Sequence, residues 1–400
     1  KGCKADCPVN VDMATYKAEF LAHHYARRLR PRTHYSMGWL PLTAALASAA
    51  PRLANALTHA PGLDRLAKLV AGIDQRRDLP LFATQTLRRW YGQRGPRGDG
   101  WRGEVVLWPD TFTNHFHPGV GQAAVEVLEA AGWRVRMPDG PLCCGLTLIS
   151  TGQLHTAKRV LRRTVAALAP HLRSGGLVLG LEPSCTAVFR SDAAELFPDD
   201  EDVRKLRRQT VTLAELLRDH TPGWRPPSVP RTALIQTHCH QHAVLGVDAD
   251  RAVLDAAGVR AEFLDSGCCG LAGNFGFERG HYEVSVACAE RVLLPALRDA
   301  DPGAVVLADG FSCRTQIAQG AAGGRQALHL AELLRAGLHG DPAGPLPERR
   351  WARRPVGPTR LTRLATTAAV AALGTAAAAV LGTRTAALLG AWPRGHRPGR

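Results

Sequence analysis

The chain has 400 residues, 45% of them hydrophobic, which is enough for sizeable cores in roughly two to four domains and excludes a disordered or collagen-like protein. The net charge of +15 is uneven, because residues 345–400 hold ten Arg and one Glu. This tail is interpreted either as a solvated basic segment or as one attracted to an anionic membrane surface. No basic stripe interleaved with aromatic residues accompanies it, so we expect no nucleic-acid partner.

The first residues carry the end of an iron–sulfur motif. Cys3-x-x-x-Cys7-Pro8 matches the last part of the bacterial ferredoxin run Cys-x-x-Cys-x-x-Cys-x-x-x-Cys-Pro. The remaining two ligands would precede Lys1, so we expect further residues upstream, and no secretory leader is visible. In two-cluster ferredoxins the last Cys serves the other cluster, which by analogy assigns Cys3 and Cys7 to neighbouring [4Fe–4S] clusters.

Helices are expected in the next part of the chain. Apolar residues recur at helical spacing from Val11 to about Arg30, with Asp12 as the N-cap. A second helical region covers residues 39–71, which are rich in Leu and Ala and are interrupted by two prolines. Residues 93–103 form a Gly-rich linker.

Beyond residue 103 short apolar strands alternate with helices, and the same order occurs twice. Each round ends in Ser-Cys and has a Cys-Cys-Gly before its long helix. Strands are expected at 105–108, 134–137, 177–181, 233–235, 261–264 and 304–307, and helices at 121–131, 154–171, 249–257 and 282–297. Equivalent cysteines are 125 to 128 residues apart. Strands that alternate with helices predict parallel α/β units.

The predicted fold class is therefore α/β, with a helical ferredoxin-like N-terminal remnant followed by two repeated small α/β cysteine-rich domains. The expected boundaries are 1–30 for the end of the 4Fe–4S ferredoxin module, 31–103 for a helical region and linker, 104–225 for cysteine-rich repeat 1, 226–342 for cysteine-rich repeat 2 and 343–400 for a basic Ala-rich tail. Ligands collect at the carboxyl ends of parallel strands, so the cysteines of each repeat are expected to converge there.

The cysteines are arranged for metal or redox chemistry rather than for disulfides. Vicinal pairs seldom form a disulfide framework, and a chain of this length without a secretory leader is expected in the reducing cytosol. Thiolates are soft ligands that suit iron–sulfur clusters and zinc. Repeat 2 offers four ligands and repeat 1 offers three, with Thr111 in place of the fourth. The candidate metal ligands are Cys239, Cys268, Cys269 and Cys313 in repeat 2 and Cys143, Cys144 and Cys185 in repeat 1.

Other residues near these cysteines leave alternatives open. His238 adds an imidazole beside Cys239, and zinc accepts both nitrogen and sulfur, so zinc in repeat 2 is an alternative to a cluster. Each vicinal pair also fits a buried structural thiol pair, and the lone Cys288 fits a packed core thiol. Glu182 and His238 either tune a bound cluster and move protons or serve as structural hydrogen-bonding groups.

The Cys-Cys-Gly pattern resembles the cysteine-rich domain named after it, which occurs in heterodisulfide reductase subunits, anaerobic glycerol-3-phosphate dehydrogenase and lactate-utilisation proteins. That family has a first Cys, then Cys-Cys, then Cys-x-x-Cys. Here Thr111, Val188 and Gln316 stand where the family has cysteines. The resemblance implies a single cluster in repeat 2, with repeat 1 degenerate, and argues against the two-cluster arrangement of heterodisulfide reductases.

Residues 1–338 as a whole resemble FAD-linked oxidases of the vanillyl-alcohol-oxidase type that are fused to a ferredoxin module and a Cys-Cys-Gly region. The resemblance lies in residues 1–8, 11–20, 181–185, 264–277 and 308–314. The family oxidises D-lactate, glycolate or D-2-hydroxyglutarate. It implies an iron–sulfur electron-transfer portion that passes electrons from FAD, bound by an upstream domain of the same polypeptide, to a quinone or another carrier.

Two further functions stay open, a heterodisulfide-reductase-like thiol–disulfide redox subunit and a zinc-stabilised interaction module. Residues 364–383 lack charge and are long enough to span a bilayer, but they are mostly Ala, so a surface-associated tail is favoured. We expect a cytoplasmic oxidoreductase, peripheral at the inner face of the membrane. Neither the hydroxy acid nor the electron acceptor follows from the sequence.

Overall fold

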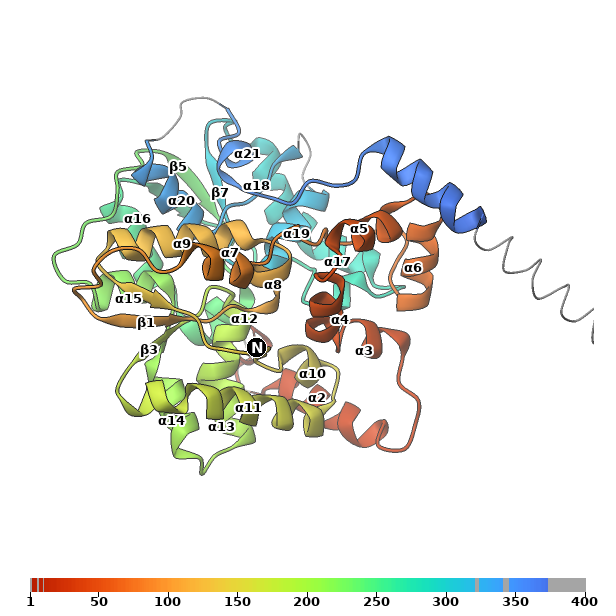
Figure 1. The fold of residues 1–400 in the computed structure, drawn as a ribbon, viewed down its shortest axis with the longest axis horizontal. Helices are drawn as coiled ribbons and strands as arrows, with labels where there is room; N and C mark the ends of the chain where they lie inside the picture. Colours follow the sequence, from red (N-terminus) through yellow and green to blue (C-terminus); the bar gives the residue numbers. More distant parts are fainter. Residues whose placement is uncertain (1, 6, 10, 321–323, 341–344, 373–400) are drawn as a thin grey trace, which may run out of the picture.

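The structure is a computed structural model that describes residues 2–5, 7–9, 11–320, 324–340 and 345–372, without the side chains of Cys3 and Ala5. Two parallel sheets form the centre of the α/β part (Figure 1). The first sheet has the strand order β2-β1-β3-β4, and the second has the order β6-β5-β7. The strands are β1 (Glu104–Leu107), β2 (Arg134–Arg136), β3 (Leu177–Leu179), β4 (Thr210–Val211), β5 (Thr232–Ile235), β6 (Arg260–Phe263) and β7 (Val305–Leu307). The predicted α/β class with parallel strands is confirmed.

The two sheets correspond strand for strand. Val105 of β1 pairs with Leu177 of β3, and Ala233 of β5 pairs with Val305 of β7. Each member of the second pair lies 128 residues after its counterpart in the first pair. Thr111 in repeat 1 therefore takes the place of Cys239 in repeat 2, as the sequence predicted. The counterpart of β4 beside the second sheet is a single parallel bridge between Leu307 and Leu328, and the sequence pattern predicted neither.

Helices cover both sheets and join them through a common core. Apolar side chains from both sheets belong to one hydrophobic cluster, and α9 packs against α20 between them. The helices of this part are α8 (Thr111–His115), α9 (Pro118–Ala130), α10 (Leu146–Ser150), α11 (Leu154–Arg173), α12 (Pro183–Ala187), α13 (Ala193–Leu196), α14 (Glu201–Gln209), α15 (Leu213–Asp219), α16 (Asp248–Ala256), α17 (Tyr282–Glu290), α18 (Leu293–Asp299), α19 (Phe311–Gly320), α20 (Leu330–Leu338) and α21 (Glu348–Trp351). The single helix expected over 282–297 is wrong, because Val292 leaves helical geometry and separates α17 from α18.

The N-terminal part is helical. Its helices are α1 (Gly2–Ala5), α2 (Met13–His24), α3 (Arg32–Ser36), α4 (Leu40–Ala47), α5 (Pro51–His59), α6 (Leu63–Ala71) and α7 (Leu87–Arg94). Asp12 caps α2 as predicted, since its Oδ1 accepts hydrogen bonds from the N–H groups of Ala14 and Thr15, both at 3.1 Å. The helix ends at His24 instead of continuing to about Arg30.

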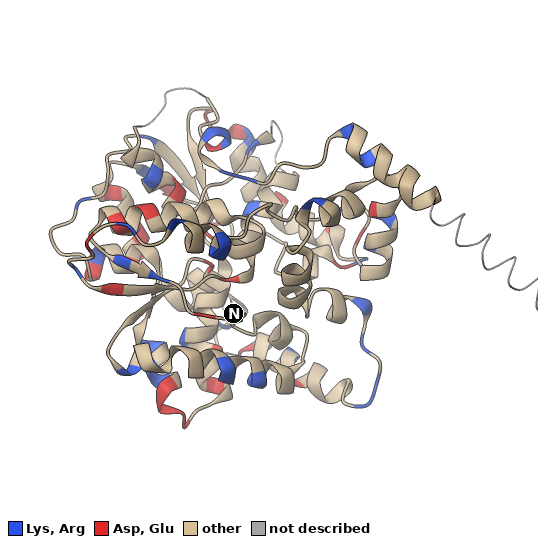
Figure 2. Ribbon diagram, viewed as in Figure 1, with Lys and Arg blue, Asp and Glu red and all other residues tan. Residues whose placement is uncertain are grey.

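The last described segment is a helix that begins at Arg360 and reaches Ala372. Figure 1 shows it next to α5 and α6, and the Thr367 hydroxyl donates a hydrogen bond of 3.1 Å to the Pro61 carbonyl. Basic and acidic residues are interspersed over the α/β part, whereas the charged residues of this helix are all Arg (Figure 2). Among the described residues, no helix has the length and apolar character needed to cross a membrane. Residues 373–383 of the uncharged stretch lie outside the described part.

Candidate metal centres

The four candidate ligands of repeat 2 come together beyond the carboxyl ends of the second sheet. Cys239 follows β5, Cys268 and Cys269 follow β6, and Cys313 lies in the first turn of α19 after β7. The Cys268 thiol is hydrogen-bonded to the thiols of Cys239 and Cys269, and Cys269 is hydrogen-bonded in turn to Cys313. Four sulfur atoms from three separate segments, each of which follows a strand, thus form one continuous group.

This group favours a bound cation. Hydrogen bonds from the thiols of Cys239 and Cys269 lower the pKa of Cys268 well below its ordinary value, and the Gly270 N–H at 3.3 Å from the Cys268 Sγ adds to this effect. The hydrogen bond to Cys268 in turn raises the pKa of both Cys239 and Cys269. The Cys268 thiolate is therefore favoured by its two thiol neighbours, and the thiolate is the form that binds metal.

Two histidines flank Cys239. The ligand atoms of His238, Cys239 and His240 all lie within 4.8 Å of one another, which is a spacing that zinc accepts. Both ring nitrogens of His238 are engaged, because Nδ1 accepts from the His240 N–H at 3.1 Å and Nε2 lies 3.3 Å from the Ser312 hydroxyl. Burial lowers the pKa of His238 to about 4, so the ring is neutral at physiological pH. The arrangement keeps zinc open as an alternative in repeat 2.

The N-terminal motif lies close to this centre. Helix α1 contacts the segment after Cys239, and a Cβ atom added to Gly2 would lie 3.5 Å from the Cys239 Cβ. The backbone of Cys3 is therefore next to repeat 2, although its side chain is outside the described part. Cys7 is partly buried. The assignment of Cys3 and Cys7 to ferredoxin clusters stays a prediction.

The cysteines of repeat 1 are also brought together. The Sγ atoms of Cys144 and Cys185 are 3.0 Å apart, and both side chains are buried. The Gly145 N–H lies 3.3 Å from the Cys143 Sγ, the same contact that Gly270 makes with Cys268. The two Cys-Cys-Gly turns therefore have the same local geometry.

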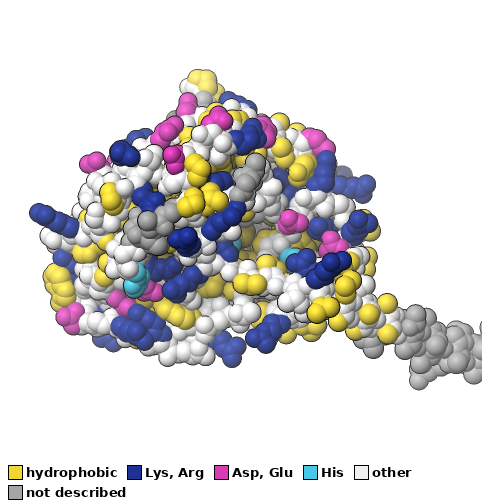
Figure 3. Space-filling view, turned by 90° about the horizontal axis from the view of Figure 1, so that it is seen from above, with side chains coloured by type: hydrophobic (Ala, Val, Ile, Leu, Met, Phe, Trp, Pro, Cys, Tyr) yellow, Lys and Arg dark blue, Asp and Glu magenta, His cyan; other side chains and the backbone are white. Residues whose placement is uncertain are grey.

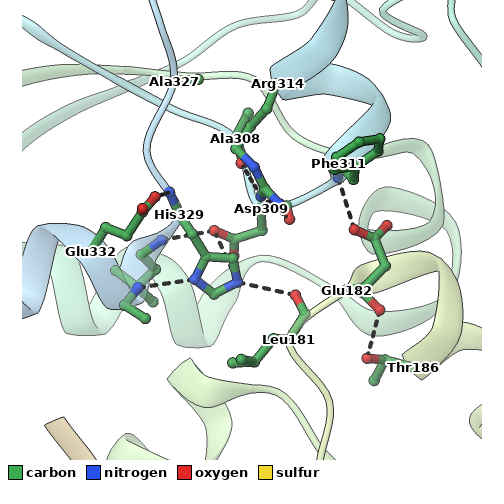
Figure 4. A network of polar contacts seen from close by, with 12 residues as sticks. Leu181, Glu182, Thr186, Ala308, Asp309, Phe311, Arg314, Ala327, His329 and Glu332 are labelled. Carbon is green, nitrogen blue, oxygen red and sulfur yellow. Dashed lines mark hydrogen bonds and ion pairs between the residues drawn. The ribbon is translucent and has the colours of Figure 1, made fainter. Parts of the chain in front are cut away.

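Buried carboxylates distinguish repeat 1 from repeat 2. Asp110, at the position equivalent to His238, caps α8 through Oδ1, and its Oδ2 has no hydrogen-bond partner among the described residues. Glu182 accepts from the Ser184 hydroxyl and, at 2.8 Å, from the Phe311 N–H of repeat 2 (Figure 4). A hydrogen bond from Cys144 lowers the pKa of Cys185, but burial and these two carboxylates outweigh it and raise the pKa to about 12. Repeat 1 therefore differs from repeat 2 in having two buried carboxylates beside its thiols.

Asp110→Asn is expected to stabilise the chain at neutral pH. Burial, followed by the charge of Glu182, raises the pKa of Asp110 from 3.8 to about 6, so folding stability falls as pH rises between these two values. Asn caps a helix as well as Asp does but carries no charge, so the gain above pH 6 is about 2 to 3 kcal/mol. Urea unfolding of the wild type and the variant, at pH values below and above the raised pKa of Asp110, measures this gain in the free energy of unfolding.

The control is Asp200→Asn, which removes the same charge from the exposed N-cap of α14. If the free energy of unfolding depended on pH in the same way for the wild type and Asp110→Asn, burial of the Asp110 carboxylate would not be costing stability.

Comparison with known proteins bears on both repeats. Residues 110–190 match the cysteine-rich domain family CCG. That segment contains Asp110, both vicinal cysteines of repeat 1 and Cys185. The chain is also similar to one of the subunits of the anaerobic glycerol-3-phosphate dehydrogenase of Escherichia coli, with 27% identity over 273 residues that cover 66% of this chain and 67% of the relative.

Two further relatives extend this similarity. The D-2-hydroxyglutarate dehydrogenase of Pseudomonas putida is 24% identical over 335 residues, which cover 79% of this chain but only 32% of the relative. Lactate utilization protein A of Bacillus subtilis is 27% identical over 217 residues, which cover 51% of this chain and 89% of the relative. The resemblance to the Cys-Cys-Gly domain and to dehydrogenases of this type is confirmed. The chain spans about a third of the D-2-hydroxyglutarate dehydrogenases it matches.

Proposed function

We propose that this chain is the iron–sulfur electron-transfer portion of a flavin-dependent 2-hydroxy-acid dehydrogenase. The observation that carries the proposal is the convergence of Cys239, Cys268, Cys269 and Cys313 beyond the carboxyl ends of a parallel sheet. Four cysteine thiolates are the ligand set of a [4Fe–4S] cluster, which supplies one-electron transfer when bound. The relatives named as dehydrogenases support the same role.

The residues of this chain would hold and shield the centre. Cys269 and Cys313 are 4% and 2% exposed, so their sulfur atoms face the protein interior, whereas Cys268 is exposed. Burial on one side limits the access of water, and exposure on the other leaves a short route for an electron. The neutral, hydrogen-bonded His238 fixes the segment that carries Cys239.

The flavin and the substrate site would belong to another part of the enzyme. In the proposed relay, FAD in an upstream domain oxidises the 2-hydroxy acid, and ferredoxin clusters with Cys3 and Cys7 as ligands lie between the flavin and repeat 2. The position of α1 against Cys239 supports this order. The matched D-2-hydroxyglutarate dehydrogenases are long enough to contain such a domain, since this chain covers 32% of one of them.

The electrons would leave to a quinone or another carrier, with the chain at the inner face of the membrane. Arg is the only charged residue type from position 349 to the end of the sequence. Hydrophobic side chains gather where the last described helix leaves the molecule (Figure 3), and Leu53, Leu66 and Leu364 of this region are each at least half exposed. Apolar and basic groups together suit an anionic lipid surface.

Metal analysis of the anaerobically purified chain tests the proposal. We expect about four iron and four sulfide per chain, lost in Cys268→Ser. Cys288→Ser is the matched control, because Cys288 is a partly buried thiol of the same repeat outside the four candidate ligands, and this variant should keep its iron.

Two other results would replace the proposal. One zinc without sulfide would favour a zinc-stabilised interaction module, which the grouping of His238, Cys239 and His240 allows. Thiol–disulfide turnover without iron would favour a heterodisulfide-reductase-like redox function.

A further inference from the structure

A buried arginine outside both repeats lies behind the Cys-Cys-Gly turn of repeat 2. We propose that Arg77 is a positioning residue that raises the reduction potential of the centre held by Cys239, Cys268, Cys269 and Cys313. The inference rests on the proposed function, because it requires a redox-active metal at these cysteines. Nothing in the sequence marks Arg77, which is one of two adjacent arginines between α6 and α7.

Main-chain contacts fix the segment that carries Arg77. Ile73 forms an antiparallel bridge with Glu278, and the Asp74 N–H donates to the Phe277 carbonyl at 2.8 Å. Residues 72–78 therefore dock along the loop that follows the Cys-Cys-Gly turn. Arg76 stays at the surface and pairs with Asp74, whereas Arg77 is 2% exposed.

The Arg77 guanidinium is surrounded by neutral acceptors. It donates to the Gly276 carbonyl at 2.7 Å, to the Ser285 hydroxyl at 2.6 Å and to the Gln316 Oε1 at 2.8 Å. In the described part of the chain no carboxylate forms an ion pair with it. Arg stays charged in proteins, and a buried charge without a counterion is costly. A negative group near Arg77 would offset that cost.

The Cys-Cys-Gly turn of repeat 2 lies behind the groups that bind Arg77. Burial lowers the pKa of Arg77, and negative charge on Tyr282, on Asp74 and at Cys269 opposes this lowering. The Ser285 hydroxyl accepts a hydrogen bond from the Arg77 guanidinium. The Ser285 carbonyl accepts one from the Gln316 side-chain amide at 3.2 Å, and Gly270 packs against this same carbonyl. Arg77 thus contacts the groups that back both the Cys-Cys-Gly turn and the helix of Cys313.

Repeat 1 lacks this arrangement and provides an internal comparison. The residue three positions after Cys313 is Gln316, and its counterpart after Cys185 is Val188. Val188 is fully buried and belongs to the same hydrophobic cluster as Cys144 and Cys185. The wall behind the cysteines is therefore apolar in repeat 1 and carries a cation in repeat 2.

A fixed cation changes the balance between the two oxidation states. Reduction adds a negative charge to the centre, and a positive charge in a low-dielectric surrounding stabilises the reduced form more than the oxidised form. The potential of the repeat 2 centre is therefore expected to be higher with Arg77 than without it. Arg76 carries the same charge, but solvent and Asp74 screen it.

The test is a redox titration of the iron-loaded chain, followed by electron paramagnetic resonance, together with iron and sulfide analysis. For Arg77→Met we expect full iron content and a lower midpoint potential. At a fixed potential the ratio of oxidised to reduced centre should be about tenfold higher, which corresponds to a fall of about 59 mV in the midpoint potential for one electron. Arg77→Lys keeps the charge and should retain most of the potential. Arg76→Met is the matched control and should leave the potential unchanged.

A double variant guards against misfolding of Arg77→Met. Arg77→Met/Gln316→Val removes both ends of one buried hydrogen bond and introduces the valine that repeat 1 has at position 188, and the same lowered potential is expected. The inference is overturned if Arg77→Met or Arg77→Met/Gln316→Val keeps its full iron and has an unchanged midpoint potential. It is also overturned if these two variants and Arg77→Lys all lose their iron. Absence of iron from the wild-type chain would instead overturn the proposed function.

Discussion

Replacing Gly270 with alanine is expected to abolish metal binding by repeat 2 and to lower the stability of the chain by roughly 3 kcal/mol. Gly270 has a φ of +89°, in the left-handed region that disfavours a side chain. An added Cβ would also collide with the Ser285 carbonyl oxygen, a backbone atom that α17 holds in place. The turn would have to move, and Cys268 and Cys269 would move with it.

Gly145→Ala in repeat 1 is the matched control. Gly145 has nearly the same φ, +83°, but the nearest atom to an added Cβ is 3.6 Å away, which is ordinary contact. Only the backbone cost of about 1 kcal/mol is expected there. Denaturant unfolding and iron analysis of both variants measure the difference. Equal losses in the two variants, or a Gly270→Ala chain with its full iron, would show that the turn of repeat 2 is not held against Ser285.

Much of the α/β part could be predicted from the sequence, because its strands are short apolar runs bounded by turns. The parallel direction and the offset between the repeats follow from the repeated pattern, and β1 and β5 lie where expected, whereas the strand order comes from the structure. Strand β4 was missed because Thr210–Val211 is too short to show any periodicity. The split between α17 and α18 was missed because Arg291 and Val292 fit a helical pattern, whereas the backbone of Val292 is not helical in the structure.

For the candidate site, the sequence predicted which cysteines are the candidate ligands and that they lie after strands of one sheet. Thiols that follow strands of one sheet were expected to meet, and they do so in both repeats. What no sequence pattern indicates is the environment of each thiol. Asp110 acts on Cys185, 75 positions later in the chain, and Arg77 bonds to Gln316, 239 positions later. Such long-range electrostatic contacts depend on the packed structure.

Glu332→Ala is expected to lower the stability of the chain by about 3 kcal/mol, the cost of leaving a buried partner charge unpaired. The Glu332 side chain is fully buried and accepts from Arg354 at 2.6 and 3.0 Å and from the His329 N–H at 3.0 Å. His329 in turn lies 3.0 Å from the Leu181 carbonyl of repeat 1 (Figure 4). Glu332 thus fixes α20, the segment after Trp351 and the contact between the repeats, and its removal affects all three.

Glu290→Ala provides the comparison, because Glu290 and Arg298 make an equally short bidentate pair, with 2.6 and 3.0 Å contacts, on side chains that are 41% and 42% exposed. We expect a much smaller loss there, because solvent screens the exposed pair. Burial raises the pKa of Glu332, but Arg354 and the hydrogen bonds outweigh it and hold the pKa below 4.5. The contribution of Glu332 is therefore complete at neutral pH and is lost as pH falls through the folded-state pKa. Urea unfolding of both variants at neutral and acidic pH measures these differences, and a Glu332→Ala cost as small as that of Glu290→Ala would show that the buried pair does not hold α20 in place.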